Sequence, residues 1–179
     1  MEISEALKSG GFKAEKSTAG DKQILKGVYK CMFVDFQNQP EGKYGPQLMA
    51  KFQITEKLSG MDSRSTFPQF TGYYSTDAEK ALSKRSGIAK LLNGFFSVGI
   101  TVETSSDEKL MESLSNLKGS AEVYISGYKK SPKKNTGTKE NPEWVDNPDG
   151  EDKQDFTFMT QKNAEREAAK QIKKDGHPL

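Results

Sequence analysis

Residues 24–56 read ILKGVYKCMFVDFQNQPEGKYGPQLMAKFQITE, and this segment contains two predicted strands joined by a turn-rich loop. Side chains alternate along its second half: Leu48, Ala50, Phe52 and Ile54 share one face, and Gln47, Met49, Lys51 and Gln53 share the other. A period of two is typical of a strand with one buried face and one face in water. The polar face carries no acid, so it is compatible with a polyanionic ligand.

The first predicted strand covers residues 27–36 and is apolar on both faces. Its apolar side chains fall into two sets: Val28, Met32, Val34 and Phe36 on one face, and Tyr29, Cys31 and Phe33 on the other. A strand of this kind is shared between two packed layers or runs through a barrel. The following loop, residues 37–46, contains two prolines and two glycines, which favour turns.

The next segments alternate between strand and helix patterns. A third strand is predicted over residues 63–71, with Pro68 at an edge or a bulge. Thr76 and Glu79 form a capping-box pattern that opens a helix, which Gly87 interrupts and Asn93–Gly94 closes.

A second capping box, Ser105 with Glu108, begins a short amphipathic helix that ends at Gly119. A fourth strand is predicted over residues 120–129, with Ala121, Val123 and Ile125 on its inner face. A short fifth strand follows over residues 156–160, and a polar helix over residues 162–174.

This order of elements predicts a mainly β, α+β fold. A five-stranded barrel of the OB-fold type, with a helical insertion between strands three and four and a polar C-terminal helix, fits the order, although other β-rich arrangements produce the same string. The predicted organisation is a flexible lead-in (1–23), an OB-fold-like nucleic-acid-binding domain (24–160) and a polar, helical or disordered tail (161–179).

Composition narrows the possible functions. The chain has 179 residues, of which 33% are hydrophobic and 29% charged, with a single cysteine and a single histidine. These two residues, Cys31 and His177, provide no internal disulfide, no convincing catalytic pair and no structural zinc site. Because phosphate-binding glycine loops are also missing, we expect no enzyme, no cofactor and no metal. The sequence has no signal peptide or bilayer-spanning segment, which predicts a soluble cytoplasmic protein.

A sharp charge reversal follows the fourth predicted strand. Residues 129–139 contain five lysines and no acid, whereas residues 140–155 contain seven acids and only Lys153 as a cation. A solvated loop whose two halves partly neutralise each other and a ligand-binding surface are both compatible with this pattern.

Binding of single-stranded nucleic acid requires cations for the phosphates and flat rings on which unpaired bases stack. In an OB-fold, the loop after strand one, the strand 2–3 face and the loop between strands four and five usually provide both. The predicted single-stranded DNA (ssDNA) site therefore consists of Lys43, Tyr44, Lys51, Arg64, Tyr73, Tyr74, Lys129, Lys130, Lys133, Lys134 and Trp144.

Several of these side chains also have a purely structural interpretation. Tyr44 can pack over its own turn, Trp144 can anchor its loop, and the tyrosine pair Tyr73–Tyr74 can belong to the rim of the core. Three phenylalanines are expected in the core itself, namely Phe33, Phe52 and Phe67.

Short motifs add a resemblance to this interpretation. They are Gly27-Val28-Tyr29, Gly42-Lys43-Tyr44-Gly45-Pro46-Gln47, Phe52-Gln53-Ile54, Gly60 and, later, Leu117-Lys118-Gly119 and Tyr128. Together they resemble phage-encoded ssDNA-binding proteins of the OB-fold type. The resemblance implies a protein that coats ssDNA during replication or recombination, with little sequence preference, in the host cell cytoplasm. The basic C-terminus, Lys170–Leu179, departs from the acidic tail of many such proteins.

Two other functions remain compatible with the sequence. The acidic residues 140–155 could instead dock the chain on a replication or recombination protein, and the same basic and aromatic residues would also permit RNA binding. Self-association into a homo-oligomer is a further possibility that the sequence leaves open.

Overall fold

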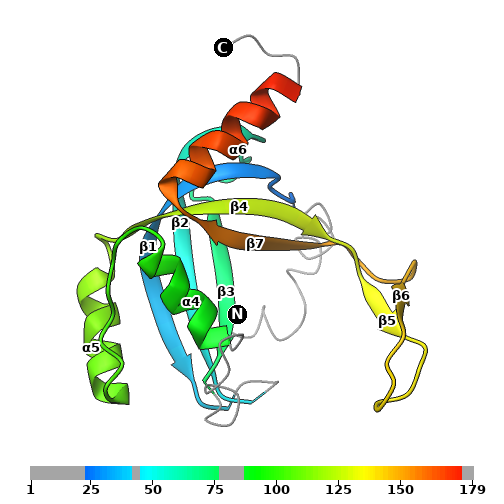
Figure 1. The fold of residues 1–179 in the computed structure, drawn as a ribbon, viewed down its shortest axis with the longest axis horizontal. Coiled ribbons are helices and arrows are strands. Elements are labelled where there is room, and N and C mark those ends of the chain that lie inside the picture. The colour runs from blue at the N-terminus through cyan, green and yellow to red at the C-terminus, as the bar shows by residue number, and fades with distance from the viewer. Residues whose placement is uncertain (1–22, 42–44, 77–86, 175–179) are drawn as a thin grey trace, which may run out of the picture.

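The computed structural model describes residues 23–41, 45–76 and 87–174. In this part of the chain, five antiparallel strands form one sheet in the order β3-β2-β1-β4-β7, and two short strands form a separate hairpin (Figure 1). The main sheet comprises β1 (Gly27–Gln39), β2 (Gln47–Gly60), β3 (Gln69–Ser75), β4 (Glu122–Lys130) and β7 (Lys153–Met159). The hairpin comprises β5 (Lys133–Asn135) and β6 (Trp144–Asp146), and the helices are α4 (Gly87–Phe96), α5 (Asp107–Leu117) and α6 (Gln161–Lys174).

These elements confirm the α+β class, the placement of helices between β3 and β4, and the C-terminal helix. Helix α6 begins where the Thr160 hydroxyl accepts a hydrogen bond from the Asn163 backbone N–H at 3.1 Å. Helix α5 is capped in the same way, although its N-cap is Ser106 rather than the predicted Ser105. No helix in the described ranges is long and apolar enough to cross a bilayer.

Strand β1 lies at the centre of the sheet and contacts a different layer on each face. Its inner residues Tyr29 and Phe33 are fully buried in the main core, whereas Val28 packs on the outer side against Ala164 and Ala168 of α6. This second contact explains why the strand is apolar on both faces. In Figure 1, α6 lies against the sheet at the opposite end of the molecule from the ends of β1 and β3.

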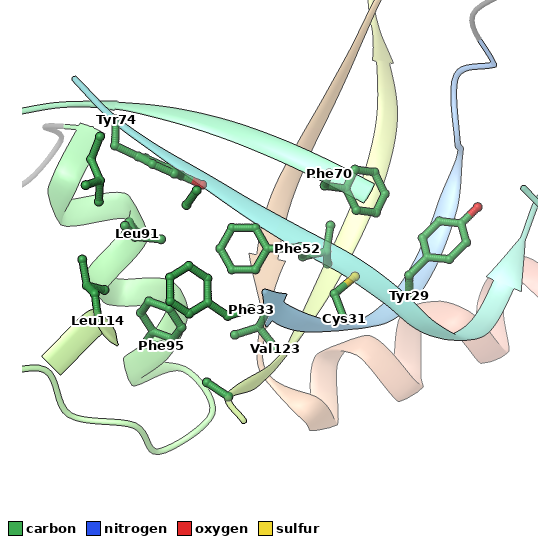
Figure 2. Packing of buried hydrophobic residues seen from close by; sticks show 14 of the residues in the cluster. Tyr29, Cys31, Phe33, Phe52, Phe70, Tyr74, Leu91, Phe95, Leu114 and Val123 are labelled. Atoms are coloured by element: carbon green, nitrogen blue, oxygen red, sulfur yellow. The ribbon is translucent and has the colours of Figure 1, made fainter. Parts of the chain in front are cut away.

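The main core is a row of aromatic rings on the inner face of the sheet (Figure 2). Phe33 from β1 lies 5.5 Å from the ring of Phe52 in β2 and 5.3 Å from that of Phe95 in α4. Full burial of such a side chain stabilises the fold by about 1.5–3 kcal/mol. The expectation that Phe33 and Phe52 are core residues is therefore confirmed.

The sheet is open between β3 and β7. No backbone hydrogen bond joins these two edge strands in the described residues, so the ladder does not close into the predicted barrel. Their side chains nevertheless meet on the inner face, where the rings of Phe70 and Phe156 lie 5.3 Å apart. We call the gap between the two edges the seam.

Helix α4 spans one end of the seam, and two glycines allow its close approach. Gly87 lies against the backbone of Tyr74 and Ser75 at the end of β3, and a Cβ atom at Gly94 would lie only 2.5 Å from Cγ of Phe158 in β7. Helix α4 therefore contacts both edge strands at positions where a side chain would not fit.

The third strand begins later than predicted. Residues 64–67 form bends, residue 63 is also outside any strand, and β3 starts only at Gln69. The Ser63 and Ser65 hydroxyls accept hydrogen bonds from the backbone N–H groups of Ser65 and Phe67, and such local turns compete with strand pairing. As a result Phe67, predicted as a core residue, is 68% exposed.

The other boundaries differ in smaller ways. Helix α4 begins at Gly87 and continues to Phe96, because Phe95 and Leu91 bury one side of it in the core. The predicted helix start at Thr76–Glu79 extends into residues 77–86, outside the described ranges. The hairpin of β5 and β6 was not predicted, since its strands are only three residues long and all their residues are exposed.

Candidate nucleic-acid interface

The outer face of β2 and β3 brings together two of the predicted site residues. Tyr73 in β3 pairs with Met49 in β2, and Lys51, two residues further along β2, pairs with Thr71. The side chains of both pairs point away from the core, because Met49 and Lys51 alternate along β2 with the fully buried residues Leu48, Ala50 and Phe52. Tyr73 is 58% exposed, and its neighbour Met49 is buried. A flat ring beside an apolar floor, about 7 Å along the strand from a cation, suits a stacked base and its phosphate.

The ammonium group of Lys51 makes no ion pair in the described part of the chain, so its charge is available to a ligand. Its partner on the other side, Asp35 in β1, is paired instead with Lys118 at 3.6 Å. The acid nearest to Lys51 in the register is therefore already partly neutralised.

The β5–β6 hairpin forms a second cationic and aromatic surface. It projects from the ends of β4 and β7, away from the helices (Figure 1). Lys130, Lys133 and Trp144 line a shallow cavity of about 740 Å³ there, together with Lys153 at the start of β7. Trp144 is 65% exposed. Its ring therefore shares the cavity with three lysines and Glu151, rather than with the acids that flank it in the sequence.

The hairpin also explains the charge reversal seen in the sequence. Its basic strand, β5, pairs with the acid-bearing β6, and Lys133 forms an ion pair with Asp146 that lowers the pKa of that carboxyl. Lys129 pairs with Asp152 at 3.5 Å. Neutralisation within the loop is thus real but partial, because Lys130 and Lys134 have no ion-pair partner among the described residues.

Arg64 does not lie on the β2–β3 face, contrary to the prediction. It belongs to the loop between the two strands, where its backbone N–H donates to Gln23 Oε1 at 2.8 Å. It lines a cavity of about 710 Å³ together with Asp152 and Lys153, near the base of the hairpin. Arg64 therefore shares a cavity with residues at the base of the hairpin and not with Lys51.

Tyr74 must be removed from the predicted set of stacking residues. It alternates with Tyr73 along β3, so its ring points inward and is only 6% exposed. A buried ring is not available to a base on the outer surface. Lys43 and Tyr44 lie outside the described residues.

Sequence reasoning missed several residues at these surfaces. In the sequence, Lys153 is only an exception within an acidic run, and Lys90 of α4 has no distinguishing signal. Tyr128 is a half-exposed residue of β4 whose hydroxyl donates to Asp155 Oδ2 at 3.0 Å. Burial, and secondarily this hydrogen bond, raise the pKa of Tyr128. Tyr128 continues the alternation of Glu122, Tyr124 and Ser126 along β4, and this alternation predicts that its side chain lies on the outer face of the sheet.

The described residues contain no group of three or more histidine, cysteine or acidic side chains that could hold a metal ion. Comparison with models of known protein families and with curated proteins finds no match to this chain.

Proposed function

We propose that this chain is a non-catalytic ssDNA-binding protein that coats unpaired strands during replication or recombination. The observation that carries the proposal is the pairing of exposed rings with unpaired cations at two surfaces. Tyr73 lies one cross-strand pair away from Lys51 on the β2–β3 face, and Trp144 of the hairpin lines a cavity together with Lys130 at the end of β4. Bases would stack on the rings while the lysines contact phosphates.

The strand order supports the finer fold assignment. In an OB-fold, a central first strand pairs with both the second and the fourth, as β1 does here with β2 and β4. With β7 as the fifth strand, closure would require only the pairing of β3 with β7. We therefore propose an OB-fold-like barrel that is open at one seam. Two of the usual ligand surfaces of that fold, the strand 2–3 face and the loop between strands four and five, correspond to the two surfaces described above.

A gel-shift comparison tests the function. The full chain should retard a single-stranded oligonucleotide at low salt and retard a duplex of the same length much more weakly, because a duplex hides its base faces. A matched RNA oligomer in a third lane separates DNA coating from RNA binding. Equal retardation of duplex and single strand would contradict a stacking interface.

The docking alternative has less support. Of the acids in residues 140–155, Asp146 is paired with Lys133 and Asp152 with Lys129, so less negative charge is free for a basic partner. Deletion of residues 131–153 separates the two functions. A DNA-binding protein should lose affinity for the oligonucleotide, whereas a docking module should lose only its protein partner.

A further inference from the structure

The seam contains a cavity that the stacking surfaces do not account for. It has a volume of about 630 Å³ and lies between the edge strands β3 and β7, with α4 at one end. Its lining includes Tyr73, Tyr74, Lys90, Tyr128 and Asp155. This volume is within the range of small-molecule sites in proteins.

A tyrosine hydroxyl lies beside this cavity. The hydroxyl of Tyr74 packs against Gly72, where a Cβ atom would come within 2.3 Å of it, and both residues line the cavity. No side chain or backbone group of the described ranges forms a hydrogen bond with this hydroxyl. Burial, with a smaller contribution from Asp155, raises the pKa of Tyr74 and keeps the hydroxyl protonated. It is therefore a donor for a ligand in the cavity.

A carboxylate lines the same cavity. Asp155 Oδ2 accepts from the Tyr128 hydroxyl at 3.0 Å, and Oδ1 accepts from the Phe156 backbone N–H at 2.8 Å. A carboxylate has about four lone-pair positions, so Asp155 retains the capacity to accept further hydrogen bonds. The cavity therefore offers a carboxylate acceptor from β7 and a protonated hydroxyl donor from β3.

These two groups are complementary to the pairing edge of an unpaired base. In thymine, the ring N3–H donor lies next to a carbonyl acceptor, which match Asp155 and the Tyr74 hydroxyl respectively. The pairing edge of each other base also places a donor beside an acceptor. The exposed ring of Tyr73 at the rim and the ammonium of Lys90 would then hold the neighbouring base and phosphate.

We infer that the seam cavity receives one base of the bound strand and holds it by its pairing edge. The inference rests on the proposed function, since the strand itself is held by the outer surfaces. At this site the protein would form hydrogen bonds with a base. At the two outer surfaces it would contact only the faces of the bases and the phosphates. A strand whose pairing edges are blocked should consequently bind less tightly, even though its bases still stack.

Equilibrium titrations of the full chain with oligo-dT and with an oligo-dT of equal length methylated at every thymine N3 test this inference. The methyl group removes the N3–H donor and leaves the π face of the ring. We expect oligo-dT to bind at least about fivefold more tightly, which is the low end of the discrimination from one good polar pair to a base. The variants Asp155→Ala and Tyr74→Phe should each move the ratio of the two affinities toward one.

Two matched variants serve as controls. Tyr124→Phe removes a tyrosine hydroxyl near the α6 contact, and Glu167→Ala removes one carboxylate on α6, both away from the seam. Both should leave the ratio unchanged. In the wild-type chain, the backbone amide resonances of Gly94 and Thr157, which line the cavity, should shift on addition of oligo-dT.

The outcomes distinguish the inference from the proposed function. Binding of neither oligomer would overturn the proposed function and the inference together. Equal affinities of the wild type for both oligomers would overturn the inference while the proposed function stands. The same holds if Asp155→Ala leaves the ratio of the two affinities unchanged. Unchanged resonances of Gly94 and Thr157 in the bound wild-type chain would do the same. Asp155→Ala decides the matter even where Tyr74→Phe fails to fold.

Discussion

At the scale of single residues, the proposal depends most on Tyr73. Replacing it by alanine removes the ring while leaving β3 its pairing, because the side chain points away from the core. We expect Tyr73→Ala to weaken ssDNA binding by about 1–3 kcal/mol, the usual contribution of one stacked base. Titration with a labelled oligonucleotide measures this weakening.

The matched variants for this prediction are Tyr73→Phe and Phe96→Ala. The first keeps the ring and should bind nearly as well as the wild type. The second removes a comparably exposed ring, 71% accessible at the end of α4, that lies outside the proposed interface. An equal effect of Phe96→Ala would show that exposed rings in general, rather than the β2–β3 face, determine affinity.

The lysines of the hairpin region divide into paired and unpaired ones, and this division makes a second prediction. Lys130 and Lys134 have no acid partner among the described residues, so alanine at both should flatten the salt dependence of binding. The slope of log affinity against log salt should fall by about 0.7 for each phosphate that the variant no longer neutralises. Affinities measured between about 50 mM and 200 mM salt give this slope.

Lys133→Ala, which changes a paired lysine of the hairpin region, is the variant to compare with the double variant of Lys130 and Lys134. It breaks the ion pair with Asp146 and leaves that acid uncompensated next to the proposed DNA-binding surface. It should therefore lower affinity without a matching decrease of slope, because the lysine is already neutralised. Equal slopes for the wild type, Lys133→Ala and the double variant of Lys130 and Lys134 would argue against phosphate contacts by the lysines of the hairpin region.

At the scale of elements, the close packing of α4 on β7 gives a prediction for stability. Gly94→Ala places a methyl group against the ring of Phe158, and overpacking of this kind costs about 1–3 kcal/mol. Alanine is a better helix former than glycine by about 1 kcal/mol, which offsets part of this cost. We expect a net destabilisation in urea unfolding. Asn93→Ala, at the exposed neighbouring position, should have little effect, and a Gly94→Ala variant more stable than the wild type would contradict this packing.

Elements with a strong period were predictable from the sequence, and those set by local polar contacts were not. Strand β2 follows from the alternation around Phe52, and α6 from its polar helical composition. The start of β3 was missed because serine hydroxyls fold residues 63–67 into turns. The later position of β3 also determines which tyrosine is available to a ligand. Tyr73 and Tyr74 lie within the strand, so their side chains point to opposite faces of the sheet.

At the scale of the whole molecule, the aromatic core predicts a decrease of stability at high pH. Burial raises the pKa of Tyr29 from 10.0 to about 12, and its hydroxyl donates to the Met61 carbonyl at 2.6 Å. Burial also raises the pKa of the Cys31 thiol. The folded chain thus holds these protons more tightly than the unfolded chain does.

The sign of the pH dependence follows from this difference. The stabilisation is complete below the unfolded pKa values, 9.0 for the cysteine and 10.0 for the tyrosine, and it is lost as pH rises through the folded values. Urea unfolding should therefore give a lower free energy of unfolding at about pH 10.5 than at about pH 8.

Cys31 should react with a thiol reagent only on unfolding, and rapid reaction of the native chain would contradict the burial of β1.

The most direct test of the central claim uses the single tryptophan. Trp144 is exposed beside Lys130 and Lys133, so stacking of a base on its ring should quench its fluorescence. Titration with oligo-dT at about 50 mM salt should give saturable quenching that weakens sharply at about 200 mM. A duplex of the same length should give little quenching. Unchanged fluorescence at the lower salt, with no oligonucleotide bound, would contradict the proposed ssDNA-binding function.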